Sequence, residues 1–296
     1  MSKPNLTKTM FESIKNSLVE EKNTNSNFKD IIKCTAGNSY LLRFVPNLED
    51  PVKTFSHYKH HGWISASTGQ YVSALCPKTW GDTCPVCLER IKLYQKKTEE
   101  AKGLAGELRE KENWLINAYV VSDPTTDENE GQVKIFRYGK QVAKVVDEAI
   151  NGEDAAEFGA AIFDLTENGC NFRVKVESIA EGSRKWISYN SSRFLNKGAI
   201  DNMTADKIKE IHNEIHDLTP PIDSKTIDEL RTMIDVHLYG KLDKDSSPAE
   251  ATNSPVDEVA ETTKTETVTT KTETVVEDTD MDTGGIDVDE LLKDLG

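Results

Sequence analysis

Three cysteines and a cluster of histidines are the residues of this 296-residue chain whose types and spacing most clearly indicate chemistry. Cys84 and Cys87 form a Cys-x-x-Cys pair in the segment Gly-Asp-Thr-Cys-Pro-Val-Cys, and Cys76 lies just upstream. Such a turn supplies two corners of a tetrahedral zinc site, and a third thiolate and one imidazole complete the shell. A closed shell leaves no position for a reactive water, so we predict one structural Zn2+ per chain. The fourth ligand is one of three clustered histidines, His57, His60 and His61.

Other uses of these residues fit the sequence less well. The chain has five cysteines, an odd number, and no recognisable secretory leader, which favours reduced thiols and a cytoplasmic location. A zinc-dependent nucleobase deaminase needs a glutamate two residues after its histidine, where Trp63 stands here. His212 and His216 have metalloprotease spacing, but Asn213 replaces the general-base glutamate. We therefore predict that the protein is not an enzyme.

Charge is distributed unevenly along the chain. The formal net charge is −15, and residues 243–296 carry sixteen acids against four bases, which leaves −3 for residues 1–242. This acidic, threonine-rich segment contains no aromatic residue and repeats Thr-Thr-Lys-Thr-Glu-Thr-Val. Because it cannot bury enough apolar surface to offset its ordering entropy, we predict a disordered acidic C-terminal tail over residues 243–296.

Short amphipathic segments occur at both ends of the chain. At the C-terminus apolar residues recur at helical spacing between acids, which indicates a motif that docks into a partner's groove. Its four apolar residues are Val288, Leu291, Leu292 and Leu295. At the other end Phe11, Ile14 and Leu18 mark one face of a short helix, so residues 1–21 are interpreted as an arm joined to the remainder by a polar linker. No run of apolar residues is long enough to span a membrane.

Between arm and tail, residues 22–242 show mainly strand signals. Five segments are short, β-branched or aromatic, and bounded by turn residues: 39–45, 114–121, 132–138, 171–178 and 185–189. Residues 88–112 form a charged helical stretch, and two helices are predicted near 205–218 and 226–240, the second with a capping box of Thr226 and Glu229. The predicted fold is mostly β with added helices. We expect an OB-fold, a five-stranded Greek-key barrel, with a zinc subdomain inserted at about residues 55–95.

Two windows of the core, residues 132–146 and 183–198, contain cations and aromatic rings but no acid. Their rings are Phe136, Tyr138, Trp186, Tyr189 and Phe194. Cations follow phosphates and flat rings stack on unpaired bases, so the combination favours single-stranded nucleic acid over duplex. The alternative is that these rings belong to the core and are merely flanked by solvated lysines.

At this point the sequence resembles a known family, the single-stranded-DNA-binding, helix-destabilising proteins of T-even-type bacteriophages. The resemblance runs collinearly along almost the whole chain. The matching segments are residues 42–46, His61 with Gly62, Cys76, residues 81–87, 120–124, 129–131, 136–140, 171–176, 194–196 and 289–295. The family's basic N-terminal cluster is reduced here to Lys3, Thr7, Lys8 and Thr9.

The resemblance implies an oligonucleotide-binding barrel with one zinc ion held by one histidine and three cysteines, and it selects His61 as the histidine. It also implies a DNA cleft lined by rings and cations. The rings are Tyr71, Tyr94, Trp114, Phe136, Trp186 and Tyr189, and the phosphate contacts are Arg43, Arg137 and Lys140. Trp186 and Tyr189 keep the family's aromatic spacing.

The function that the resemblance implies is to coat and protect single-stranded DNA during phage replication, recombination and repair. Preferential binding of unpaired strands would destabilise duplex DNA. The arm would bind a neighbouring copy along the DNA, and the tail would recruit phage replication and recombination proteins, all in the cytoplasm of an infected bacterial host. The alternative is a zinc-stabilised protein–protein adaptor that does not touch DNA.

Overall fold

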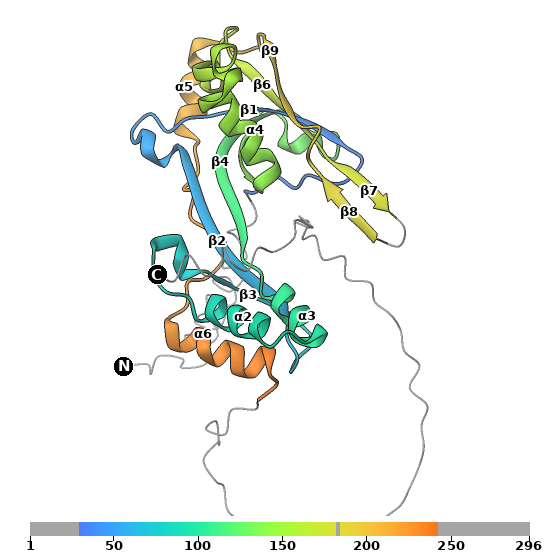
Figure 1. The fold of residues 1–296 in the computed structure, drawn as a ribbon. Coiled ribbons are helices and arrows are strands. Elements are labelled where there is room, and N and C mark those ends of the chain that lie inside the picture. Colours follow the sequence, from blue (N-terminus) through green and yellow to red (C-terminus); the bar gives the residue numbers. More distant parts are fainter. Residues whose placement is uncertain (1–29, 182–183, 242–296) are drawn as a thin grey trace, which may run out of the picture.

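The computed structural model describes residues 30–181 and 184–241 of the chain (Figure 1). The predicted arm at residues 1–21 and the predicted tail at 243–296 therefore lie outside the described residues. The same holds for the predicted docking residues Val288, Leu291, Leu292 and Leu295.

The centre of the structure is a seven-stranded sheet in the order β3-β2-β4-β1-β6-β9, with β5 paired to the free side of β4. All of the pairings between these strands are antiparallel. The strands are β1 (Ser39–Phe44), β2 (Phe55–Ile64), β3 (Tyr71–Leu75), β4 (Lys111–Ser122), β5 (Val133–Tyr138), β6 (Cys170–Lys175) and β9 (Arg193–Lys197). A separate hairpin is formed by β7 (Glu177–Glu181) and β8 (Arg184–Ser188).

Helices follow local capping signals in the sequence. Thr98, Thr204 and Thr226 each accept a hydrogen bond from a backbone N–H in the first turn of a helix, and Thr226 forms the predicted capping box with Glu229. The helices are α2 (Pro85–Gln95), α3 (Glu99–Glu107), α4 (Lys140–Asn151), α5 (Ala205–Asn213) and α6 (Ile227–Met233). A π-helical turn (Ile234–Leu238) extends α6, and the chain leaves it at Gly240 in a left-handed conformation.

Two bodies are joined by the long strands β2 and β4, which run from one to the other (Figure 1). The sheet body contains β1, β5, β6, β9, α4 and one end of β4. Its core includes Phe44, Phe136 and Phe172, and α4 packs on it through Val142 and Val146. The cluster body contains β3, α2, α3, α6 and the other end of β2. Its core combines the three cysteines with apolar residues of these helices.

The cluster body draws on more of the chain than the predicted subdomain at residues 55–95. Leu230, Met233 and Leu238, from α6 and its π-helical extension, pack with Val86 and Leu93 of α2 in one apolar cluster. A segment more than 130 residues downstream thus closes over the cysteines. The reason is physical: α2 and α3 are short, and burying their apolar faces requires a further helix.

The mostly β fold with added helices is confirmed, and each of the five predicted strand segments contains a strand. β2, β3, β9 and α4 were not predicted from the sequence. The OB-fold and its five-stranded Greek-key barrel stay predictions. Every helix within residues 30–181 and 184–241 is too short or too polar to cross a bilayer.

Candidate metal centre and nucleic-acid interface

The four predicted metal ligands come together in the cluster body. One ligand atom from each of His61, Cys76, Cys84 and Cys87 lies within 4.8 Å of the others, and all four residues are buried. His61 is on β2, Cys76 follows β3, and Cys84 and Cys87 begin α2. Pro85 occupies the first turn of α2, where its missing N–H costs no helix hydrogen bond, and this position lets the Cys-x-x-Cys turn enter the helix directly.

The separations of the ligand atoms fit a tetrahedral metal site. Zinc–sulfur bonds of about 2.3 Å at tetrahedral angles place two sulfurs about 3.8 Å apart, and a sulfur and an imidazole nitrogen about 3.6 Å apart. Here Sγ of Cys76 lies 3.8 Å from Sγ of Cys87, and Nε2 of His61 lies 3.4 Å from Sγ of both Cys84 and Cys87. The donor set therefore has the size that one metal ion requires.

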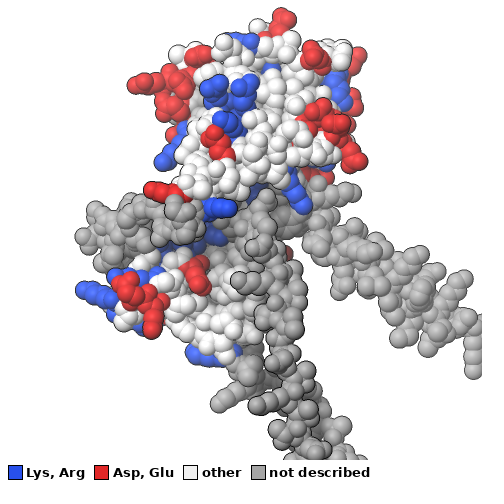
Figure 2. All heavy atoms as spheres, turned by 90° about the vertical axis from the view of Figure 1, so that its right-hand side faces the viewer, with Lys and Arg blue, Asp and Glu red and all other residues white. Residues whose placement is uncertain are grey.

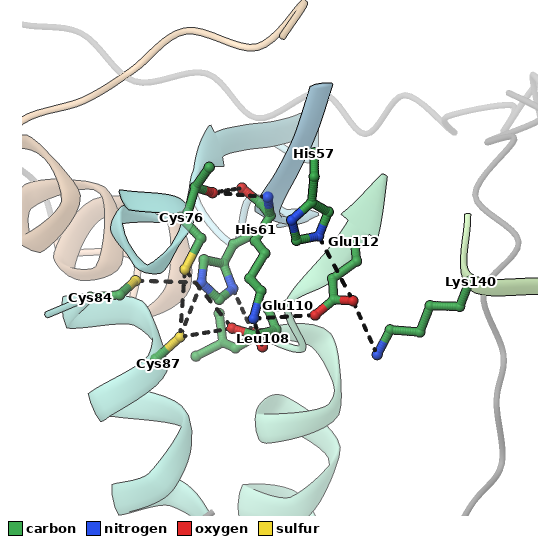
Figure 3. A network of polar contacts seen from close by, with 11 residues as sticks. His57, His61, Cys76, Cys84, Cys87, Leu108, Glu110, Glu112 and Lys140 are labelled. Atoms are coloured by element: carbon green, nitrogen blue, oxygen red, sulfur yellow. Dashed lines mark hydrogen bonds and ion pairs between the residues drawn. The ribbon is translucent and has the colours of Figure 1, made fainter. Parts of the chain in front are cut away.

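The orientation of His61 is fixed from its other side. Nδ1 of His61 lies 2.9 Å from the carbonyl oxygen of Leu108 (Figure 3), so the Nδ1–H donates to this carbonyl. The proton is thereby held on Nδ1, and the lone pair of Nε2 points at the sulfurs. A backbone carbonyl in this position is the usual outer partner of a metal-binding histidine.

Charge within the cluster also calls for a cation. Hydrogen bonds from the thiols of Cys76 and Cys87 lower the pKa of Cys84, whereas the neighbouring Cys84 raises the pKa of Cys76 to about 12 and contact with both thiols raises that of Cys87. Without a metal, one thiolate is stabilised at the expense of the other two. A dication at the centre would remove this conflict and allow all three to ionise.

A stack of three rings lies on one face of the sheet, where β2, β4 and β5 are paired. His57 and Trp114 are directly opposite across β2 and β4, with ring centroids 4.6 Å apart, and Trp114 lies opposite Tyr138 of β5 at 6.1 Å. Tyr138 is buried, Trp114 is partly exposed and His57 is exposed. Trp114 is therefore the middle of an aromatic row that continues into the core.

Cations surround this row, together with two carboxylates, Glu112 and Glu110, and Glu110 lies 3.6 Å from Nζ of Lys59. Glu112, two residues before Trp114 and on the same face, lies 3.2 Å from Nζ of Lys59, 3.8 Å from Nζ of Lys140 and 4.0 Å from Nε2 of His57 (Figure 3). Lys140 is half exposed, with a relative accessibility of 48%. Hence two lysines and a histidine converge beside Trp114, and Glu112 and Glu110 partly neutralise them.

The β7–β8 hairpin joins this surface through α4. Trp186 is partly exposed on β8, opposite Ile179 of β7. Tyr189, just after β8, donates its backbone N–H to the side-chain oxygen of Gln141 at 2.7 Å, and Gln141 is next to Lys140 at the start of α4. Tyr189 therefore lies beside the start of α4, and Trp186 lies three residues before it on β8. We call the rings of His57, Trp114, Trp186 and Tyr189, with Lys59 and Lys140, the ring-and-cation surface, because each of these rings is at least partly exposed.

Other predicted contact residues lie away from this surface. Tyr71 and Arg137 are exposed on the opposite face of the sheet from Trp114. Arg137 pairs with Leu115, the residue after Trp114, and successive residues of a strand point to opposite faces. Tyr71 pairs with Ile64, which likewise points away from the face of His57 and Trp114. The ring of Tyr71 packs over Gly62, where a Cβ would meet the end of the tyrosine side chain and displace it. Tyr94 lies on α2 in the cluster body, with the guanidinium of Arg90 5.4 Å from its ring centroid.

Two of the predicted DNA contacts, Arg43 and Phe136, are buried in the structure. Arg43 has no exposed surface, and its guanidinium donates to the backbone oxygens of Asp164, Thr166 and Gly198 and to Oδ1 of Asn171. Every branch of the guanidinium is satisfied, so none remains for a phosphate. Phe136 is 1% exposed and packs among Phe44, Tyr138 and Phe172, so a base cannot stack on it.

His57 and Lys59 were missed as members of the surface. Histidines near the cysteines were considered only as metal ligands, and β2 was not predicted as a strand. A signal existed, since the odd-numbered positions of β2 carry His57, Lys59 and His61 on one face. On the face in Figure 2, acidic side chains gather toward the margins of the sheet body, and a basic group with one acidic neighbour lies between them. The net charge of the whole chain therefore does not describe this face.

A β-sheet protein with a buried Cys3His cluster and an aromatic, basic surface is thus defined, and comparison with known proteins agrees with it. Residues 35–235 match a model of the family described as gp32 DNA binding protein like. The protein named "Single-stranded DNA-binding protein" of Enterobacteria phage T2 is 31% identical over 208 residues, and that of Enterobacteria phage T4 is 30% identical over 208 residues. Each match spans 67% of this chain and 65% of the relative. The chain belongs to the gp32-like DNA-binding protein family.

Proposed function

We propose that this protein binds single-stranded DNA through the ring-and-cation surface. The observation that carries the proposal is the position of Trp114, stacked between His57 and Tyr138 with Lys59 and Lys140 beside it. Unpaired bases stack on such rings at about 1–3 kcal/mol each, and lysines neutralise the phosphates between them. Membership of a family whose relatives are named single-stranded DNA-binding proteins supports the same reading.

Binding by stacking explains selectivity against duplex. Bases of a duplex are already stacked on one another and present only their edges in the grooves, so the exposed face of His57 and the ring of Trp186 have nothing to contact. The protein would destabilise duplex DNA without catalysis, because it removes unpaired strands from the equilibrium by mass action. Neutralising phosphates releases counterions, and the affinity should therefore fall steeply with salt.

The metal is proposed to be a single structural Zn2+ held by His61, Cys76, Cys84 and Cys87. Three thiolates and an imidazole are the donors that zinc prefers in closed sites, and the spacing of the four atoms supports it. When bound, the ion would hold β2, the segment after β3 and the start of α2 together. An OB-fold for the sheet body belongs to the same proposal.

The biological role is proposed from the family. The protein would coat and protect single strands during phage replication, recombination and repair in the cytoplasm of an infected bacterial host. Residues 1–21 would contact a neighbouring copy on the strand, and residues 243–296 would recruit replication and recombination proteins through Val288, Leu291, Leu292 and Leu295. The acidic tail would also compete with DNA for the cations of the core at low salt.

The test of DNA binding is a titration of the full-length, zinc-loaded protein with oligo(dT), followed by tryptophan fluorescence. We expect quenching at low salt, reversal on adding salt, and no quenching with a blunt duplex of equal length. Single-strand and duplex titrations that give the same response would reject stacking as the basis of binding. Absence of any response to oligo(dT) at low salt, checked by a gel-shift assay, would reject DNA binding itself.

A further inference from the structure

A basic pocket on the sheet body lies outside the ring-and-cation surface. It is a hollow of about 510 Å3 lined by Ser39, Arg173, Lys175, Ser191 and Arg193. These residues come from β1, from β6, from β9 and from the turn before β9. Three cationic side chains and two hydroxyls thus face one hollow, and no acid lines it.

Strand register places the pocket on the side of the sheet away from the apolar core. Arg173 pairs with Leu41, and Lys175 pairs with Ser39, whereas the intervening Val174 faces the core beside Tyr40. Arg173 lies directly opposite Arg193 across β6 and β9. Like charges in this position repel, so the pair destabilises the sheet unless an anion lies between the two guanidiniums.

The charges of Arg173 and Arg193 are not neutralised by ion pairs among the described residues. Among residues 30–181 and 184–241, no carboxylate lies within ion-pair distance of Arg173 or Arg193. Lys175 differs, because its Nζ lies 2.7 Å from Glu177, and Ser191 donates to the other oxygen of Glu177 at 2.5 Å. Glu177 therefore neutralises the lysine at the rim, and the guanidiniums keep their full charge.

The pocket is connected directly to an aromatic residue of the ring-and-cation surface. The turn that carries Tyr189 ends at Ser192, whose N–H donates to the Tyr189 carbonyl at 2.9 Å. The hydroxyl of Ser192 accepts the backbone N–H of Lys175 at 3.0 Å, and this bond ties the turn to β6. Ser191, which lines the pocket, is two residues from Tyr189. If a base of single-stranded DNA stacks on Tyr189, the sugar-phosphate backbone of that DNA therefore lies next to the pocket.

We propose that this pocket binds a phosphodiester group of the single strand whose base stacks on Tyr189. Paired guanidiniums donate in a fork that matches phosphate oxygens, and the hydroxyl of Ser39 adds a neutral donor, whereas that of Ser191 already donates to Glu177. This inference rests on the proposed function and adds to it a backbone-binding site on the opposite side of the sheet from Trp114. The strand would consequently pass around the base of the β7–β8 hairpin instead of ending at it.

The test compares the full-length R173Q/R193Q double variant with wild type by oligo(dT) titration at several salt concentrations. Each lost phosphate contact lowers the slope of log affinity against log salt by about 0.7, so we expect a decrease of about 0.7–1.4. At 0.1 M salt this corresponds to an affinity about 5- to 25-fold weaker. The matched control K209Q/R231Q removes the same charge from exposed positions on α5 and α6 and should leave the slope unchanged.

Each other result has a definite meaning. An unchanged slope in R173Q/R193Q, with wild type binding normally, overturns the pocket but leaves the ring-and-cation surface intact. Tighter binding by the double variant also overturns it, because it means that the pocket holds carboxylates of the acidic tail. A lower melting temperature without DNA overturns it as well, since relief of repulsion predicts an unchanged or higher one. If wild type itself ignores oligo(dT), the proposed function fails first.

Discussion

Nδ1 of His61 and the carbonyl oxygen of Leu108 are 2.9 Å apart, and this contact ties the metal cluster to the end of α3. Leu108 lies three residues before β4, the strand that carries Trp114. The metal ligand, the helix and the aromatic row are therefore connected along a short path of covalent and hydrogen bonds. Loss of the metal should be felt at Trp114 even though no ligand touches it.

The first prediction concerns the metal. Purified protein should contain one equivalent of zinc per chain, and Cys87→Ser should lose most of it. Because the cluster organises the core of the cluster body, we expect a loss of several kcal/mol, a fraction of the about 10–16 kcal/mol with which zinc stabilises isolated fingers. Metal analysis and thermal melting measure both effects. Cys34→Ser, outside the cluster, is the control, and a Cys87→Ser protein with full zinc content would reject the ligand assignment.

The second prediction concerns the hairpin. Trp186→Ala should weaken oligo(dT) binding by about 1–3 kcal/mol, roughly 5- to 150-fold, because one base loses its stacking partner. The strand pairing of β8 would remain, since alanine keeps the backbone bonds. Trp80→Ala is the matched control, because Trp80 is 57% exposed and lies in the 3-10 turn after Cys76, outside the hairpin. Equal losses in the two variants would argue against stacking at the hairpin.

The third prediction separates a structural from a phosphate-binding role for Arg43. Arg43→Gln removes the donor to three partly buried carbonyl groups, at about 1 kcal/mol each where water does not replace it, so the free energy of unfolding should fall by roughly 1–3 kcal/mol. The salt slope of DNA binding, measured where the variant is folded, should stay at the wild-type value. A stable variant whose affinity depends less steeply on salt would show that Arg43 contacts DNA.

The fourth prediction concerns the acid within the cationic surface. Glu112→Gln removes the carboxylate beside Lys140 and His57 and one of the two beside Lys59, which keeps Glu110, so single-stranded DNA should bind more tightly, by roughly 3- to 10-fold at low salt. The gain should shrink as salt is added. Glu99→Gln removes an equal charge from an exposed site on α3 and should change little. Weaker binding by Glu112→Gln would show that the carboxylate positions the lysines.

The fifth prediction concerns pH. Burial lowers the pKa of His57 from 6.5, against the opposing attraction of Glu112, and Lys59 and Lys140 lower it further. The unfolded chain therefore binds the proton more readily, and the folded state loses stability as pH falls below about 6.5. An approaching phosphate favours the protonated imidazole, so DNA affinity should rise between pH 7 and 5.5. Binding isotherms across this range test it, and His57→Gln should remove the rise.

The metal cluster could be predicted from the chain because its ligands are close in sequence and chemically distinctive. Cys84 and Cys87 share one turn, and Cys76 and His61 reach them across a single strand pair. Strand segments rich in β-branched and aromatic residues could likewise be predicted, because the turn residues that bound each segment are close to it in sequence. By contrast α4 was missed, although Val142 and Val146 are one helical turn apart, because its lysines suggested a binding window instead of a helix.

The roles of individual cations and rings depended on pairings that no local pattern contains. Arg43 and Lys140 look alike in sequence as cations beside aromatic residues, yet one is enclosed by carbonyls from residues more than 120 positions away and the other stays half exposed. Residue type and spacing settle which chemistry a side chain can perform. Burial and cross-strand neighbours determine whether the side chain can use that chemistry, because desolvation and interaction partners arise only when distant segments pack together.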